Sequence, residues 1–289
     1  MTTTRYTTTI LSLALLLTLG GCVKDELHDT PHPDTGKISV TADWADRGEG
    51  VDIPVSWHIA MGDYSGTETG ATHAPDYLFN PGNYTLAAYN TPEGITVSGT
   101  TATLAAADGG FIVNAPGWLF TSVQEVAIEA DTDYSLTAVM RQQVRELTLM
   151  IEPAGDAAER IESIEGTLSG AAGTLDFATG THGTPSEVEL HFTKITDGDD
   201  AGKWMATVRL LGIAGDAQRL TATLTYTDGN PQPTSLNSDL TSALNSFNDG
   251  KTAPLTLGGT IAETPDEAGF TGEISGWEKV DGGEVDAEM

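Results

Sequence analysis

Apolar and polar residues alternate along almost the whole of this chain, and short stretches rich in Gly, Asp and Asn separate the alternating segments. Around residue 190, for example, Val188, Leu190 and Phe192 alternate with charged or polar side chains. Successive side chains of a β-strand point to opposite faces of its sheet, so this alternation predicts strands with one buried face. Many short strands with little helix indicate an all-β protein made of sandwiches or barrels.

The alternation also predicts where the strands lie. We expect strands in residues 38–44, 55–61, 84–88, 134–140, 147–151, 188–192, 204–210, 220–226 and 270–280. Two stretches depart from the alternation and predict one or two short helices, at Asp156–Arg160 and at Asn237–Phe247. The second prediction rests on three apolar residues at helical spacing, which are Leu240, Leu244 and Phe247.

A polar and basic stretch at Arg141–Val144 separates two strand-rich halves of the chain. We place a domain boundary there, which predicts an N-terminal β-sandwich domain at residues 37–141. The C-terminal β-sandwich domain would then span residues 142–289 and end in an acidic tail. A chain of 289 residues is long enough for two domains of ordinary size.

The N-terminus has the features of a bacterial export signal. Arg5 precedes an apolar run at Ile10–Leu19, and two glycines then lead to Cys22, the only cysteine of the chain. The run is shorter than the roughly 20 residues that span a bilayer, which favours a signal peptide. A cysteine directly after the small residues favours a lipoprotein, with a signal peptide at residues 1–21 and lipid (palmitate-type acyl chains) on Cys22. The alternatives are an ordinary secretory signal and an uncleaved anchor.

Residues 22–36 are predicted to form a flexible, acidic linker, because the Pro/Asp-rich stretch up to Gly36 offers little apolar surface to bury. Lys24, Asp25 and Glu26 form a charged, mostly acidic cluster that is separated from the cysteine by one residue. This cluster resembles the export signal of Bacteroidetes surface lipoproteins, which implies a surface-exposed position on the cell outer membrane. The alternative interpretation is a solvated linker without a signal function, and the two interpretations are compatible.

The charge balance excludes several classes of partner. The chain carries 42 acidic against 13 basic residues, and no lysine or arginine occurs between Gly48 and Met140. Nucleic-acid binding and attraction to anionic lipid headgroups both need clustered basic side chains, so we expect neither. With its only cysteine assigned to lipid, the chain has no thiol for a disulfide or for catalysis.

No motif for catalysis, metal binding or a cofactor stands out. The six histidines are scattered, and there is no zinc-protease motif, nucleophile elbow or phosphate-binding loop. Asp197–Gly202 looks like the start of a calcium loop, but it has Ala201 at a ligand position and lacks the closing glutamate. We therefore predict a protein that is not an enzyme and has no cofactor, although spacing alone leaves open a carboxylate pair for glycoside hydrolysis.

Taken together, the lipidation signal, the acidic cluster and the two β-rich halves resemble the fimbrial-anchor or fimbrillin-like lipoproteins of Bacteroidales. The resemblance runs from about Gly21 to Trp277. The segments that carry it are Cys22–Leu27, Gly36–Trp44, Asn80–Asn90, Met140–Ile151 and Phe270–Trp277. It implies two tandem transthyretin-like β-sandwiches and a role in cell adhesion, as a fimbrial anchor or a minor fimbrial subunit. It brings no catalytic residues with it.

The resemblance also implies a mechanism of assembly, in which fimbrial subunits are the partners and one subunit donates a strand to its neighbour. In polymerising relatives an Arg-specific protease first removes the opening strand. Arg47 lies just after the strand predicted at residues 38–44, and it is the only lysine or arginine between Lys37 and Arg141. Arg47 is therefore a possible cleavage site, whereas the plainer interpretation is an ordinary turn arginine in an anchor that keeps its first strand.

A glycan-binding surface lipoprotein of a polysaccharide-uptake system is the alternative function. It predicts a row of exposed aromatic side chains, for which Trp118, Tyr64 and Tyr77 are the candidates. The other tryptophans are expected to pack in the interior, because they lie on the apolar side of predicted strands; they are Trp44, Trp57, Trp204 and Trp277.

Overall fold

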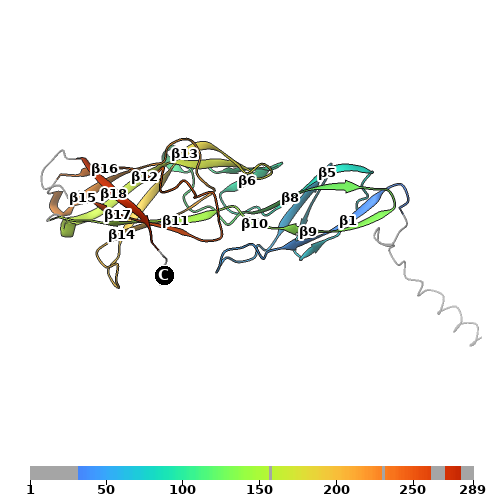
Figure 1. Ribbon diagram of the computed structural model, residues 1–289, viewed down its shortest axis with the longest axis horizontal. Helices are drawn as coiled ribbons and strands as arrows, with labels where there is room; N and C mark the ends of the chain where they lie inside the picture. Colours follow the sequence, from blue (N-terminus) through green and yellow to red (C-terminus); the bar gives the residue numbers. More distant parts are fainter. Residues whose placement is uncertain (1–31, 156–157, 230–231, 262–270, 281–289) are drawn as a thin grey trace, which may run out of the picture.

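The computed structural model describes residues 32–155, 158–229, 232–261 and 271–280, which form an elongated molecule with two β-regions end to end (Figure 1). The regular structure in this part of the chain is almost entirely strand, and the all-β sandwich prediction is confirmed. The predicted signal peptide, the lipidation site Cys22 and the Lys24–Glu26 cluster lie outside the described residues. No helix among the described residues has the length and apolarity to cross a membrane.

The first β-region is built from two sheets that face each other. One has the strand order β4-β1-β9 and the other the order β10-β8-β5-β2-β3. The strands are β1 (Gly36–Asp43), β2 (Trp57–Met61), β3 (Tyr64–Glu68), β4 (Thr72–His73), β5 (Gly82–Tyr89), β8 (Phe120–Ile128), β9 (Thr132–Val139) and β10 (Arg141–Gln142). β1 pairs in parallel with β9 along its whole length and antiparallel with the short β4. The inward side chains of both sheets meet in one hydrophobic core.

The second β-region forms a closed circuit of strands. Its order is β13-β14-β11-β17-β18-β16-β15-β12, and β12 pairs back with β13. The strands are β11 (Arg145–Glu152), β12 (Ile161–Asp176), β13 (Thr181–Lys194), β14 (Trp204–Leu210), β15 (Arg219–Tyr226), β16 (Thr234–Asp239), β17 (Leu255–Ile261) and β18 (Thr271–Lys279). A closed circuit leaves fewer unpaired strand edges than an open sheet does.

One hairpin from the first half of the sequence belongs to the second β-region. β6 (Ile95–Ser98) and β7 (Thr101–Leu104) pair with each other, and β7 pairs with the end of β12. Ile95, Ala102 and Leu119 join the second core accordingly. The domain boundary predicted between residues 141 and 142 stays a prediction. The pairing of β7 with β12 shows that residues 95–104 contribute strands to the second β-region.

The predicted helix at Asn237–Phe247 is wrong. Its first residues belong to β16, which pairs with β15, and the chain continues in turns. Leu240, Leu244 and Phe247 are all fully buried, so the apolar spacing marked core residues but not a helix. Pairing with β15, the strand just before it in the sequence, overrode the local helical spacing. At Asp156–Arg160, the described part forms one short 3₁₀ turn, Ala158–Arg160, and residues 156–157 lie outside the described part.

A second difference concerns the strand predicted at residues 55–61. The observed strand β2 begins only at Trp57, and Val51–Ser56 has no strand pairing. Val55, which the alternation placed on the buried face, is 88% exposed. Alternation records which residues would share a face if the segment were paired, but it does not determine where pairing begins.

Candidate functional site at the junction of the two β-regions

The first strand after the predicted linker is firmly built into the first β-region. Ile38 and Val40 of β1 are 1% and 0% exposed, and the strand lies between β9 and β4. Gly36 and Phe79 exchange two backbone hydrogen bonds at its beginning, and the Met140 amide donates to the Asp43 carbonyl at its end. Removing β1 would therefore break a ladder on each side and expose core residues.

Arg47 lies where the sequence predicted it, in an exposed loop just after β1. Its guanidinium Nη1 donates to the Trp44 carbonyl at 3.0 Å, which closes the loop on itself. Trp44 packs edge to face on Phe120, with ring centroids 5.5 Å apart, so the base of the loop rests on the core. The side chain that a protease would recognise is thus on the surface.

The next residue, Gly48, is buried against the second β-region. Its amide donates to Oε1 of Gln142 at 2.8 Å. A Cβ atom at this position would lie 2.6 Å from the Thr252 carbonyl oxygen, which is closer than real Cβ contacts occur. Only a glycine fits between Gln142 and Thr252 without a shift of the backbone.

Gln142 connects three segments that are far apart in sequence. It is 6% exposed, and its Nε2 donates to the Val144 carbonyl at 3.0 Å and to the Lys251 carbonyl at 2.8 Å. With Oε1 accepting from Gly48, one amide side chain joins the loop after β1, the crossing between the regions and the turn before β17. We call this arrangement the Gln142 latch.

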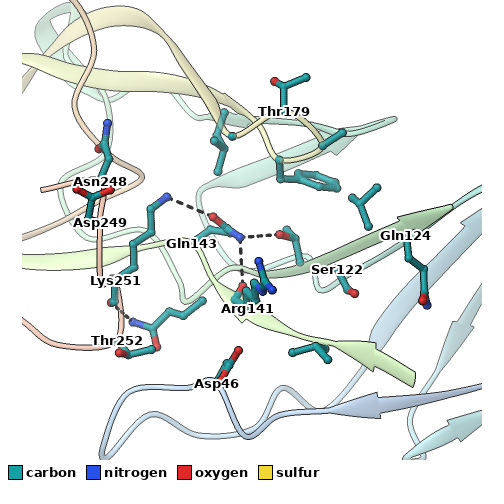
Figure 2. A pocket seen from close by; sticks show the side chains of 18 of the residues that line it. Asp46, Ser122, Gln124, Arg141, Gln143, Thr179, Asn248, Asp249, Lys251 and Thr252 are labelled. Carbon is teal, nitrogen blue, oxygen red and sulfur yellow. Dashed lines mark hydrogen bonds between the residues drawn. The ribbon is translucent and has the colours of Figure 1, made fainter. Parts of the chain in front are cut away.

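A groove of about 980 Å³ lies beside the latch, between the two β-regions (Figure 2). Its walls come from β8, the end of β9, the tip of the β12–β13 hairpin and the turn at residues 248–252. Figure 2 shows the side chains of Lys251 and Gln143 meeting inside it. The Lys251 ammonium contacts Gln143 Oε1 at 3.2 Å, the Leu211 carbonyl at 3.3 Å and His182 Nε2 at 3.1 Å.

Burial sets the charge states in this groove. Burial lowers the pKa of Lys251 to about 8, and the contacts described for its ammonium are all with neutral acceptors. Burial and the nearby Lys251 charge lower the pKa of His182 to about 4, so its ring is neutral at neutral pH and can accept the ammonium proton. The network uses each of the three ammonium donors in holding segments together, which suits a structural role.

Arg145 is a second connection that sequence reasoning missed. Its guanidinium is buried and donates to the backbone carbonyls of four residues, Ala253, Ser246, Phe247 and Asp249, while it also stacks over the Phe247 ring. The only sequence signal was the polar stretch at residues 141–144. Neither the partner turn nor the latch could be inferred, because the partners lie about a hundred residues further along the chain.

The candidate aromatic residues do not form an exposed row in the described part of the chain. Tyr77 is 39% exposed, and Tyr64 packs on it with ring centroids 5.3 Å apart. The Tyr64 hydroxyl is engaged with His73 Nε2 at 2.6 Å. Trp118 is half-buried beneath the Arg209 guanidinium, which lies 5.2 Å from its ring centroid. The tryptophans expected inside are buried or half-buried.

The described residues contain no group of three or more His, Cys, Asp or Glu side chains that could hold a metal ion. One set of titratable groups outside the groove is Tyr64, His73 and Glu68, where Glu68 Oε2 lies 3.3 Å from His73 Nδ1. Burial, followed by the charges of Asp76 and Glu68, raises the pKa of Tyr64, so its hydroxyl stays protonated and is a poor nucleophile.

Comparison with known proteins gives one family and several related structures. Residues 62–281 match the family model described as Mfa2, fimbrillin-A associated anchor proteins Mfa1 and Mfa2. No curated protein matches the chain.

Three solved structures are similar in fold. The fimbrial anchor protein Mfa2 from Porphyromonas gingivalis is 15% identical, with a TM-score of 0.57 over 85% of this chain and 97% of that one. A candidate adhesin from Bacteroides ovatus is 17% identical, with a TM-score of 0.58 over 92% and 99%. A candidate polysaccharide-binding protein from Bacteroides thetaiotaomicron is 10% identical, with a TM-score of 0.55 over 85% and 98%.

Proposed function

Because the chain belongs to the family of fimbrillin-A associated anchor proteins Mfa1 and Mfa2, we propose that it holds a fimbria at the cell surface, as its anchor or as a minor subunit near its base. Fimbrial anchoring and adhesion are the functions of this family, and its members are associated with the cell surface. The role is one of protein–protein attachment and involves no catalytic step.

The observation that carries the anchor role is the position of β1. This strand follows the predicted linker directly and is fully integrated into the first β-region, with Ile38 and Val40 buried. A lipid on Cys22 would then be joined to a folded domain through residues 23–35 alone. In this proposal Lys24, Asp25 and Glu26 direct the lipoprotein to the outer face of the cell outer membrane, and Arg47 remains uncut.

The partners in this proposal are other fimbrial subunits, which assemble by strand donation. In the described part of the chain, five strands end their sheet orders and have a strand neighbour on one side only; they are β3, β4, β9 and β10 in the first region and β6 in the second. Such edges have unpaired backbone groups that can accept a strand from another chain. The alternating side chains of a donated strand would then fix its register.

Replacing Cys22 with serine tests the anchor role in a cell that makes the fimbria. Without lipid the protein cannot hold the fibre, so we expect fimbriae of normal subunit composition to appear in the culture medium and to be lost from the cells. Electron microscopy and quantification of shed fimbriae measure this. If cells carrying Cys22→Ser, or lacking the protein, keep fimbriae of unchanged number, length and attachment, the proposal fails.

N-terminal sequencing of the protein in purified fimbriae separates anchor from polymerised subunit. An N-terminus blocked at Cys22 is the expected result. A chain that begins at Gly48 would show that Arg47 is cut, and the protein would then be a component of the fibre that has lost its first strand.

A further inference from the structure

The Arg47 side chain is exposed, but the peptide bond that follows it is not in a free loop. On the carboxyl side of that bond, Gly48 is buried and its amide is engaged by Gln142 at 2.8 Å. The Gly48 carbonyl accepts from the Val51 amide at 3.2 Å, which bends the chain back immediately after the bond. On the amino side, the Arg47 guanidinium is bound to the Trp44 carbonyl.

A protease needs several residues on both sides of the bond to lie extended in its active site. Here the segment after Arg47 can become extended only if Gly48 leaves the space between Gln142 and Thr252. Gln142 lies in β10 of the first region and donates to the Lys251 carbonyl of the second, while Thr252 belongs to the second region itself. The hydrogen bond to Gly48 therefore comes from a residue 94 positions away in sequence. The second region holds Gln142 in place through the Lys251 carbonyl and confines Gly48 through the Thr252 carbonyl, so the docked junction completes the block.

We propose that the Gln142 latch protects the Arg47–Gly48 bond from Arg-specific proteases for as long as the two β-regions are docked. Cleavage would add water across this amide and leave an Arg47 carboxylate and a Gly48 ammonium. Cleavage becomes possible only when the junction opens. The exposed Arg47 therefore marks a bond that a protease can cut in the opened state but not in the docked one. The inference deepens the proposed function, because it explains how an anchor keeps β1 and everything before it.

The expected size of the protection follows from the hydrogen bonds involved. When opening and closing are fast, the cleavage rate follows the population of the opened state. Loss of a buried hydrogen bond that leaves a partner unsatisfied raises that population by about tenfold or more. Weakening the latch should therefore speed cleavage at Arg47 by about tenfold, without any change in the arginine itself.

Timed digestion of the purified, full-length lipoprotein with trypsin tests this, with each cut identified by mass spectrometry. In the wild type, the cut after Arg47 is expected to be at least about tenfold slower than in the same chain unfolded in urea. Gln142→Ala removes the latch amide, and Gly48→Ala displaces the loop by steric contact with Thr252. Both variants should be cut after Arg47 about tenfold faster than the wild type.

Two controls keep the result specific. Gln124→Ala changes another groove-lining glutamine, which donates to the Thr137 carbonyl and does not touch the loop, and it should leave the Arg47 rate unchanged. The cut after Arg219, within β15 and directly before the buried Leu220, reports global unfolding and should stay slow in every variant.

Three results would overturn the proposal. One is cleavage of the wild type after Arg47 at the unfolded rate. Another is an unchanged Arg47 rate in both latch variants. The third is acceleration in step with the Arg219 cut, which would assign the effect to general unfolding. None of these depends on fimbriae, so the latch and the anchor role can fail separately.

Discussion

The two β-regions use the same strand pattern but differ in how their sheets end. The first has two separate sheets, one with β4 and β9 at its ends and the other with β3 and β10. The second is a circuit closed by the pairing of β12 with β13. Open edges can accept a strand from another chain, whereas a closed circuit has its backbone groups paired internally. Among the described strands, the first region therefore has most of the open edges, while the second region keeps one, at β6.

The regions also differ in how they bury polar groups at the junction. The second region provides the charged or titratable side chains Arg145, Lys251 and His182, whereas the first provides the Gly48 loop and the neutral amide of Gln142. The junction therefore depends on the second region being folded. This asymmetry predicts that damage in the second region weakens both regions, while damage in the first stays local.

The largest effect is expected from Arg145→Met. The variant leaves four carbonyl groups of the turn at residues 246–253 without their donor, the Phe247 carbonyl in a buried place and the other three half-buried. We expect a loss of about 4 kcal/mol in the free energy of unfolding, measured by urea denaturation. Arg141→Met, which changes an exposed arginine four residues earlier, should cost at most about 0.5 kcal/mol. Equal losses of unfolding free energy in the two variants would show that Arg145 does not hold the turn at residues 246–253.

Matched core truncations should give the next largest effect and test the comparison directly. Ile38→Ala in the first core and Ile164→Ala in the second each remove a fully buried side chain. Each should cost about 3 kcal/mol. Hydrogen exchange is expected to show faster opening only in the first region for Ile38→Ala, because the second core contains no residue of β1. For Ile164→Ala, the Gly48 amide should also exchange faster. Equal acceleration of both regions by Ile38→Ala would show one cooperative unit.

The smallest effect concerns the acid response of His182. Its pKa in the folded protein is lowered to about 4 by burial and by Lys251, below the ordinary histidine value of 6.5. Between these two pH values the unfolded chain binds more protons than the folded one, so the contribution to stability is lost as pH falls. Because the ring is only half-buried and solvent screens its charge, the slope should be about 0.5 kcal/mol per pH unit, well below the roughly 1.4 kcal/mol that one full proton gives.

His182→Gln keeps a hydrogen-bond acceptor for Lys251 but cannot be protonated in this range. Its unfolding free energy should therefore fall less steeply than that of the wild type from pH 6.5 to pH 4. Carboxylates elsewhere titrate alike in both proteins, so the difference between the two curves isolates the histidine. Parallel curves would show that His182 does not sense acid in the folded state.

Much of the fold could be predicted from the sequence, because the alternation of side chains is a local property. Ile38, Val40, Leu190 and Leu224 all face the interior as the pattern required. At Val55 the alternation predicted a strand that begins too early, because the start of a strand depends on pairing. Around Leu240 the helical spacing of apolar residues predicted a helix that does not form. In both places the deciding factor was whether a neighbouring strand was available.

By itself, then, the sequence determined which faces of most strands are buried and the family to which the chain belongs, because these follow from local patterns of residues. Lipidation at Cys22 stays a prediction from the same kind of local pattern. Only the tertiary structure decided that β6 and β7 join the second region and that Gln142 meets Gly48 and Lys251. Such contacts join residues up to 109 positions apart. No local pattern encodes them, because each depends on the pairing of whole sheets.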